Sequence, residues 1–244
     1  FQEQKEIEVL PSFVQRLDHG NGRNKRFEAT LDNGDRITAS NVLLALGFRY
    51  FKNIPRKIAE IVPSERFSHT CELVDFERLR GKRCLIIGGR QSAYEWAALL
   101  GDNGATAIHI SHRHETPAFA PSDWSWVNPM VDAMVDNPGW FRNLPPKEKD
   151  ELSKRFWAEG RLKLEPWLWP RIDNDAVNIW PKSRVVGCDV LPRGELEVSL
   201  DTGKMLIVDH IILATGYKVS MEKVPLLADG TILVKLQTKD GYPV

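Results

Sequence analysis

The chain lacks an excess of charge of one sign, and it lacks any long apolar run. Lys plus Arg number 33 and Asp plus Glu also number 33, so the formal net charge is zero. Proteins that bind nucleic acid by neutralising phosphates normally carry a basic excess, so this class is excluded. No apolar run approaches the ~18 residues of a membrane-spanning helix. Hydrophobic residues make up 42% of the 244 residues, a composition typical of a folded chain of one or two domains.

Cysteine is scarce as well. The chain has an odd number of cysteines, and none of them belongs to a CxxC pair. They are Cys71, Cys84 and Cys188. This pattern excludes a disulfide framework and a cysteine-based zinc site, so no metal is expected. We expect no signal peptide and a cytoplasmic protein. The chain opens on Phe1 and closes on the strand-like residues 241–244, so we expect that both ends are cut from a longer protein.

Apolar runs and turn residues predict strands near the N-terminus. Residues 26–31 and 36–38 are predicted strands of a hairpin, because an Asn-Gly turn separates them. A third strand is predicted over residues 42–45 and ends at Gly47. Residues 49–70 contain two prolines, which interrupt regular secondary structure, and are predicted to form a linker.

The middle of the chain has the pattern of a strand, a helix and a second strand. Residues 83–87 form a short continuous apolar run, which is typical of a strand covered on both faces. Residues 91–100 have apolar side chains at helical spacing, and residues 106–111 form another strand-like run. This order predicts a parallel sheet with a right-handed crossover.

Tryptophan is concentrated in one segment. All eight tryptophans except Trp96 fall within residues 115–180, which also contain many prolines. A helix is predicted from about residue 147 to residue 159, and the remainder of the segment is predicted to be irregular. This segment is either a wall or lid beside a substrate or a compact insertion filled by aromatic side chains. After it, residues 183–190 and 195–200 predict a hairpin, and residues 209–214 predict a last strand.

The sequence contains an internal repeat. Residues 31–49 align with residues 200–218 without a gap, and both copies end in Leu-Ala-x-Gly followed by an aromatic and a basic residue. The period is too long for a solenoid, so the repeat predicts two domains of one design. By analogy with the distance from Gly88 to Gly216, a second glycine turn is expected about 80 residues before Phe1.

A glycine-rich turn lies between the first predicted strand of the middle region and its helix. This is the position at which a turn can hold a dinucleotide pyrophosphate against free N–H groups. Arg90 stands where the pattern G-x-G-x-x-G/A has its second glycine, so its side chain either hinders close approach or supplies charge to a phosphate. The residues of the turn are Gly88, Gly89, Arg90, Gln91, Ser92 and Ala93.

The end of the next strand bears on the choice between NADH and NADPH. An acid at this place would bind the ribose hydroxyl of NADH, but the strand ends in Ser111, His112 and Arg113. Arg113 suits a 2′-phosphate, so NADPH is favoured. His112 is included among the candidate cofactor-binding residues as a phosphate-side histidine.

These motifs, with Phe67-Ser68-His69-Thr70 and Ala214-Thr215-Gly216-Tyr217, resemble those of the flavin-containing, N-hydroxylating and Baeyer–Villiger monooxygenases. The resemblance implies an α/β fold: a Rossmann-like three-layer NADP-binding domain with a central parallel sheet and a β-meander, plus partial strands of an FAD-binding domain. It implies FAD and NADPH as cofactors. Gly47, Ala214, Thr215, Gly216 and Tyr217 are candidate cofactor-binding residues, and residues 215–217 would mark the return crossing into the FAD-binding domain. The implied boundaries are 1–55 and 217–244 for the FAD-binding parts and 56–216 for the NADP-binding domain.

The implied activity is an NADPH-dependent monooxygenation of a small amine, sulfide or similar molecule through a peroxyflavin. Two alternatives stay open from the residues alone. One is a flavin-dependent reductase that passes electrons onward, although the disulfide-reducing branch is weakened because the chain has no CxxC. The other is a non-catalytic nucleotide-binding module. The sequence names neither the substrate nor the oligomeric state, and it predicts no nucleic-acid partner.

Overall fold

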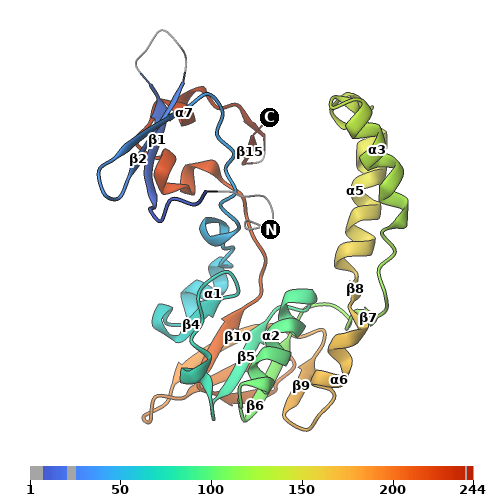
Figure 1. The fold of residues 1–244 in the computed structure, drawn as a ribbon. Helices are drawn as coiled ribbons and strands as arrows, with labels where there is room; N and C mark the ends of the chain where they lie inside the picture. Colours follow the sequence, from blue (N-terminus) through green and yellow to red (C-terminus); the bar gives the residue numbers. More distant parts are fainter. Residues whose placement is uncertain (1–7, 21–25, 240, 244) are drawn as a thin grey trace. The chain divides into compact units, whose positions relative to one another are not determined.

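Figure 1 shows the fold in a computed structural model that describes residues 8–20, 26–239 and 241–243. The predicted cut ends at Phe1 and Val244 fall outside these residues. The chain divides into two compact units, one of residues 54–215 and the other of residues 1–53 with 216–244. Among the described residues, no helix has the length and apolar character needed to cross a membrane. The assignment of the units to NADP and FAD binding stays a prediction.

A five-stranded parallel sheet forms the centre of the unit 54–215, and its strand order is β4-β13-β5-β6-β9. The predicted strands of the middle region and the predicted last strand are confirmed. In sheet order, the strands are β4 (Phe67–His69), β13 (His210–Leu213), β5 (Arg83–Ile87), β6 (Ala107–Ser111) and β9 (Val177–Trp180).

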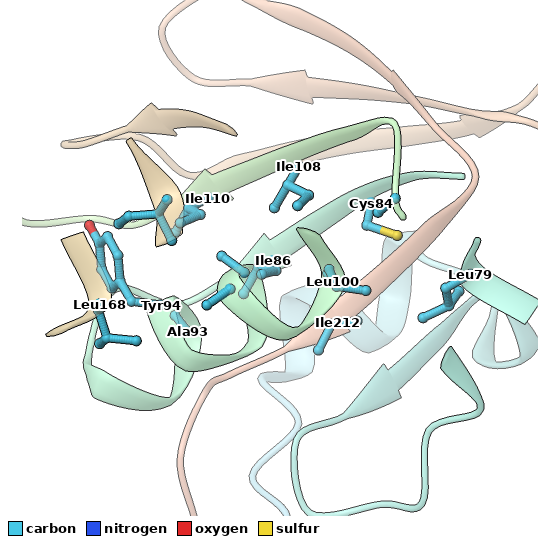
Figure 2. Packing of buried hydrophobic residues seen from close by; sticks show 14 of the residues in the cluster. Leu79, Cys84, Ile86, Ala93, Tyr94, Leu100, Ile108, Ile110, Leu168 and Ile212 are labelled. Carbon is cyan, nitrogen blue, oxygen red and sulfur yellow. The ribbon is translucent and has the colours of Figure 1, made fainter. Parts of the chain in front are cut away.

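Helix α2 (Gln91–Asp102) covers one face of this sheet, as Figure 2 shows. Its buried side chains include Ala93, Tyr94 and Leu100, which pack on Ile86 of β5 and Ile108 of β6. The helical spacing of the apolar residues therefore places a continuous stripe of α2 against the sheet.

An antiparallel meander covers the opposite face. It consists of β10 (Val185–Val190), β11 (Leu196–Leu200) and β12 (Met205–Val208). Leu85, Ile211 and Leu213 point to this side because side chains alternate along a strand. The expected three layers, with a central parallel sheet and a meander, are confirmed.

Two predictions for this unit are wrong in part. Residues 49–70 are not only a linker, because they contain helix α1 (Arg56–Ile61) and the edge strand β4. Three residues of β4 are too short to give a clear pattern, and pairing with β13 defines the strand. The tryptophan-rich segment is not irregular outside its predicted helix, which is confirmed as α5 (Pro146–Arg161).

The further elements of that segment are short, so their propensities are weak and their packing decides them. Strand β9 joins the parallel sheet beside β6, with Ile110 opposite Ile179. The other elements are β7 (Ala118–Phe119), α3 (Asn128–Asp136), α4 (Trp140–Asn143), β8 (Lys163–Leu164) and α6 (Trp169–Ile172).

The second unit contains its own small sheet and core. Strands β1 (Val14–His19), β2 (Phe27–Leu31) and β3 (Arg36–Ala39) form an antiparallel meander, which confirms the predicted N-terminal hairpin. Leu17, Phe51 and Leu227 belong to its buried core. Helix α7 (Thr231–Lys235) and the short strands β14 (Thr238–Lys239) and β15 (Tyr242–Pro243) complete the unit.

The internal repeat is visible as repeated structure. Strands β2 and β3 occupy the same places in their copy as β11 and β12 in theirs, and each meander has a register irregularity at the start of its first strand. The predicted strand over residues 42–45 is absent, although it aligns with β13. β13 lies between two parallel neighbours, whereas within the described part of the chain no strand pairs with residues 42–45.

Candidate nucleotide-binding site

The glycine turn begins at Gly88, where β5 ends. The backbone of Gly88 has φ of +146°, and a Cβ atom there would lie 2.3 Å from the carbonyl oxygen of Ala214. Its N–H donates to the carbonyl of Ser111 at 3.0 Å. The ends of β5, β6 and β13 therefore converge on this residue, and only glycine fits both the conformation and the space.

Gly89 is required for a different reason. A Cβ atom on Gly89 would lie 2.3 Å from Cγ of His112, so the imidazole ring occupies the space beside it. Arg90 follows with φ of −114° and ψ of −177°, an extended conformation open to any residue. The backbone of the turn therefore accepts Arg90 where the pattern has a second glycine. The difference from a glycine at this position is the space that the arginine side chain occupies.

Helix α2 starts directly after Arg90 and extends from Gln91. Its free N–H groups and the positive end of its dipole lie at the turn, which suits a phosphate. Ala93 is fully buried against the sheet, as the small residue of the pattern requires. The Gln91 amide donates to Glu95 and accepts from the backbone N–H of Glu165. Gln91 thus joins the tryptophan-rich segment to α2 by a hydrogen bond. Ser92, in the first turn of the helix, is partly exposed.

Arg90 and Arg113 bring two positive charges to the turn. The pKa of the Arg90 guanidinium is lowered, chiefly by burial and further by the charge of Arg113. In the part of the chain that the structure describes, neither side chain forms an ion pair with a carboxylate. Two neighbouring guanidinium groups without acidic partners suit an anion with several acceptor oxygens.

His112 lies within the protein and not on its surface. Its side chain is 4% exposed, its Nε2 lies 3.1 Å from the Tyr94 hydroxyl, and its Nδ1 lies 2.9 Å from the carbonyl oxygen of His114. Burial lowers its pKa, which favours the neutral ring. The sequence predicted that His112 binds the cofactor, and the geometry places its ring beneath the turn with both nitrogens hydrogen-bonded.

The second glycine segment continues from β13. The Ala214 N–H donates to Ile87, which keeps the ends of the two strands together. Gly216 has φ of +78° and its carbonyl accepts from the N–H of Asn53, while Tyr217 stacks on Phe48. Thr215 joins these residues and is partly buried. Gly47 has φ of +62°, so both copies of the repeat end in a glycine with a left-handed backbone.

Sequence reasoning did not identify Tyr94 as part of this site. Tyr94 is fully buried on α2, and its hydroxyl lies 3.1 Å from Nε2 of His112. Burial raises the pKa of Tyr94 to about 12, so the phenol stays protonated. A phenol on the buried face of a helix needs a polar partner, and this signal points to a neighbouring polar side chain.

Two other predicted features lie away from the glycine turn. The Ser68 hydroxyl lies 2.9 Å from Nε2 of His210, and His69 is fully buried at the end of β4. These contacts give the Ser68-His69 pair a structural place in the sheet. No group of three or more His, Cys, Asp or Glu side chains suited to a metal ion occurs among the described residues.

A comparison with protein families matches residues 12–219 to the L-lysine 6-monooxygenase/L-ornithine 5-monooxygenase family. The chain belongs to this family. A curated relative is the FAD-dependent urate hydroxylase of Xanthomonas campestris, which is 27% identical over 160 residues, 59% of this chain and 33% of the relative. The chain thus spans about a third of that relative.

Several solved structures have a fold similar to that of this chain. The ornithine N-hydroxylase of Kutzneria sp. 744 has a TM-score of 0.68 at 19% identity, covering 97% of this chain and 60% of that one. The reduced ornithine hydroxylase of Pseudomonas aeruginosa has a TM-score of 0.67 at 17% identity, with 98% and 60% covered. The cadaverine monooxygenase of Erwinia amylovora has a TM-score of 0.58 at 20% identity, with 93% and 56% covered.

Proposed function

We propose that the chain forms the NADPH-binding part of an FAD-dependent monooxygenase, together with portions of its FAD-binding part. The observation that carries the proposal is the glycine turn at the start of α2 with Arg90 and Arg113 beside it. Gly88 and Gly89 let the turn pack tightly against Ala214 and His112, because a Cβ atom at either position would overlap these residues. The family assignment of residues 12–219 is consistent with this use of the turn.

The residues present fit a phosphorylated dinucleotide. The N–H groups at the start of α2 would hold the pyrophosphate, and Arg90 and Arg113 would hold the 2′-phosphate that distinguishes NADPH from NADH. Gly47 and residues 214–217 are proposed to lie toward FAD, at the crossings between the two units. When bound, the two cofactors would supply hydride transfer and oxygen activation.

The proposed substrate is a small amine, with a sulfide or similar nucleophile as the broader class. Support comes from the family name and from the related ornithine and cadaverine enzymes. No acid–base pair of this chain is needed, because the work of its residues is to bind, orient and exclude water. We place the enzyme in the cytoplasm, where its cysteines would stay reduced.

The tryptophan-rich segment is proposed to form a wall on the substrate side. Trp124, Trp126 and Phe156 form an aromatic cluster, and the Arg155 guanidinium lies 4.1 Å from the centre of the Trp126 ring. Aromatic surfaces of this kind bury large areas and exclude water. The Gln91 side chain, at the start of α2, accepts a hydrogen bond from the backbone N–H of Glu165. This bond joins the glycine turn to the tryptophan-rich segment.

A binding and product assay tests the proposal. The protein is titrated with NADPH and with NADH by calorimetry, its FAD content is read from the absorbance spectrum, and NADPH oxidation is followed with and without lysine, ornithine or cadaverine. We expect tighter binding of NADPH than of NADH and a hydroxylated amine as product. A colourless protein that binds neither nucleotide would contradict the proposal, and peroxide without hydroxylated product would favour a reductase.

A further inference from the structure

We infer that Tyr94 and His112 are positioning residues that set the spacing of Arg90 and Arg113, and thereby the preference for NADPH over NADH. The inference rests on the proposed function. It adds that two buried residues behind the glycine turn contribute to the selection of NADPH over NADH. Neither residue belongs to the glycine pattern, and neither is exposed to a ligand, since Tyr94 is fully buried and His112 is 4% exposed.

The His112 ring lies between the two stretches of backbone that carry Arg90 and Arg113. The His112 ring lies against Gly89, where a Cβ atom would come within 2.3 Å of it. Gly89 directly precedes Arg90, and His112 directly precedes Arg113. The contact between Gly89 and His112 therefore fixes the distance between the backbones that carry the two guanidinium groups. A ligand that uses both groups senses this distance, and one that uses neither does not.

Hydrogen bonds determine which nitrogen of the His112 ring carries the proton. The carbonyl of His114 can only accept, so Nδ1 of His112 carries the proton and donates to it at 2.9 Å. Nε2 is then the acceptor, and the Tyr94 hydroxyl donates to it at 3.1 Å. Each ring nitrogen has one partner of the right kind, which holds the imidazole in a single orientation.

The backbone of His112 is hydrogen-bonded on both sides, as its ring is. Its N–H donates to Trp180 at the end of β9, and its carbonyl accepts from the N–H of Ser183. The Ser183 hydroxyl in turn lies 2.9 Å from the hydroxyl of Ser111. Because these hydrogen bonds hold the backbone of His112, we expect a change in its ring to act on Gly89 and on the turn.

Three variants test this inference against a matched control. His112→Gln removes the ring, Tyr94→Phe removes only the hydroxyl, and His109→Gln removes a half-buried histidine from β6, the strand that precedes His112. His109 accepts from the Trp180 indole N–H at 3.3 Å. The dissociation constants of NADPH and NADH are measured for each variant, with the melting temperature as a measure of folding.

We expect His112→Gln to weaken NADPH binding about tenfold and NADH binding much less, since NADH has no 2′-phosphate to bridge the two arginines. Tyr94→Phe should weaken NADPH binding about threefold, and His109→Gln should leave the ratio of the two constants unchanged. If His112→Gln lowers the melting temperature but leaves that ratio within about twofold of the wild type, the inference is overturned.

A nucleotide-free measurement separates this inference from the proposed function. Nitrogen-15 NMR of the imidazoles should show His112 as the neutral tautomer protonated at Nδ1, and Tyr94→Phe should shift its Nε2 resonance. A charged or Nε2-protonated ring would overturn the inference while leaving the nucleotide proposal intact. A wild-type protein that binds neither nucleotide would sink the proposed function, and with it the role in specificity, even where the NMR result is as expected.

Discussion

Phe48 and Tyr217 stack on one another with their ring centroids 4.4 Å apart and their planes inclined by 19°. They occupy equivalent positions in the internal repeat, and each follows a glycine with positive φ, Gly47 and Gly216. Tyr217 also pairs as an antiparallel bridge with Lys52. The C-terminal ends of the two copies are therefore in contact at Phe48 and Tyr217. This contact lies within the unit of residues 1–53 and 216–244.

Gly88→Ala should destabilise the protein more than the same substitution at a glycine with free space around it. The new Cβ atom would overlap the Ala214 carbonyl, and that oxygen is part of the backbone and cannot move aside. We expect a loss of about 3 kcal/mol or more in the free energy of unfolding, measured in urea. Gly203→Ala is the control, because Gly203 has φ of +84° with nothing within 4 Å, and it should cost about 1 kcal/mol. Equal losses would show that the Ala214 contact does not restrict the turn.

Arg90→Gln and Arg113→Gln should each weaken NADPH binding about tenfold or more and NADH binding by less than about threefold. The reason is the loss of one of two guanidinium groups beside the turn. Calorimetric titration at low and moderate salt checks this, and the dependence of NADPH affinity on salt should become shallower in both variants. Arg184→Gln, at an exposed position outside the site, serves as the control. Equal losses for the two nucleotides would show that the arginines do not select the 2′-phosphate.

Leu44 and Leu213 are equivalent in the repeat but lie in different surroundings. Leu213 is fully buried between β4 and β5, whereas Leu44 is 38% exposed in a segment without strand structure. Leu213→Ala should cost about 2–5 kcal/mol of unfolding free energy, and Leu44→Ala should cost less than about 1 kcal/mol. Chemical denaturation of this chain measures both. Similar losses would mean that residues 42–45 are packed in solution.

Asp209 joins the meander to the sheet through Arg83. Its carboxylate accepts from Nε and Nη2 of Arg83 and from the Arg83 backbone N–H, at 2.8–3.1 Å. These bonds lower the pKa of Asp209 below its usual value near 4. The stabilisation is therefore complete above about pH 4 and is lost as the pH falls through the lowered folded-state value.

Asp209→Asn should accordingly destabilise the protein by about 1–2 kcal/mol at neutral pH and flatten the acid side of its stability profile. Unfolding experiments over a series of pH values test this. Asp201→Asn offers a comparison, because Asp201 is exposed and its carboxylate accepts from the backbone N–H of Arg184. An acid profile that is identical in Asp209→Asn and in the wild type would contradict this account.

Much of the fold follows from local sequence. Continuous apolar runs identified β5, β6 and β13, and the helical spacing after Gly89 identified α2. The order of strand, glycine turn and helix also placed the candidate site, because a parallel sheet with a crossover helix leaves few other arrangements. These features could be predicted because each is set by the period of its own side chains.

The edges of the sheet could not be predicted in this way. β4 and β9 are short, and they are strands because β13 and β6 offer them hydrogen-bonding partners. The opposite error occurred at residues 42–45, which have the composition of β13 but no partner strand in the described part of the chain. A strand is a property of at least two segments, so its own sequence is not sufficient.

The sequence by itself determined the parallel α/β sheet, the glycine turn and the internal repeat, since these depend on residues adjacent in the chain. Only the tertiary structure decided where the His112 ring lies. Its neighbours in sequence suggested a residue facing a phosphate, but the strand end turns its ring inward against Gly89 and Tyr94. The direction of one side chain at the end of a strand depends on the elements that pack around it, and the spacing of sequence motifs does not contain that information.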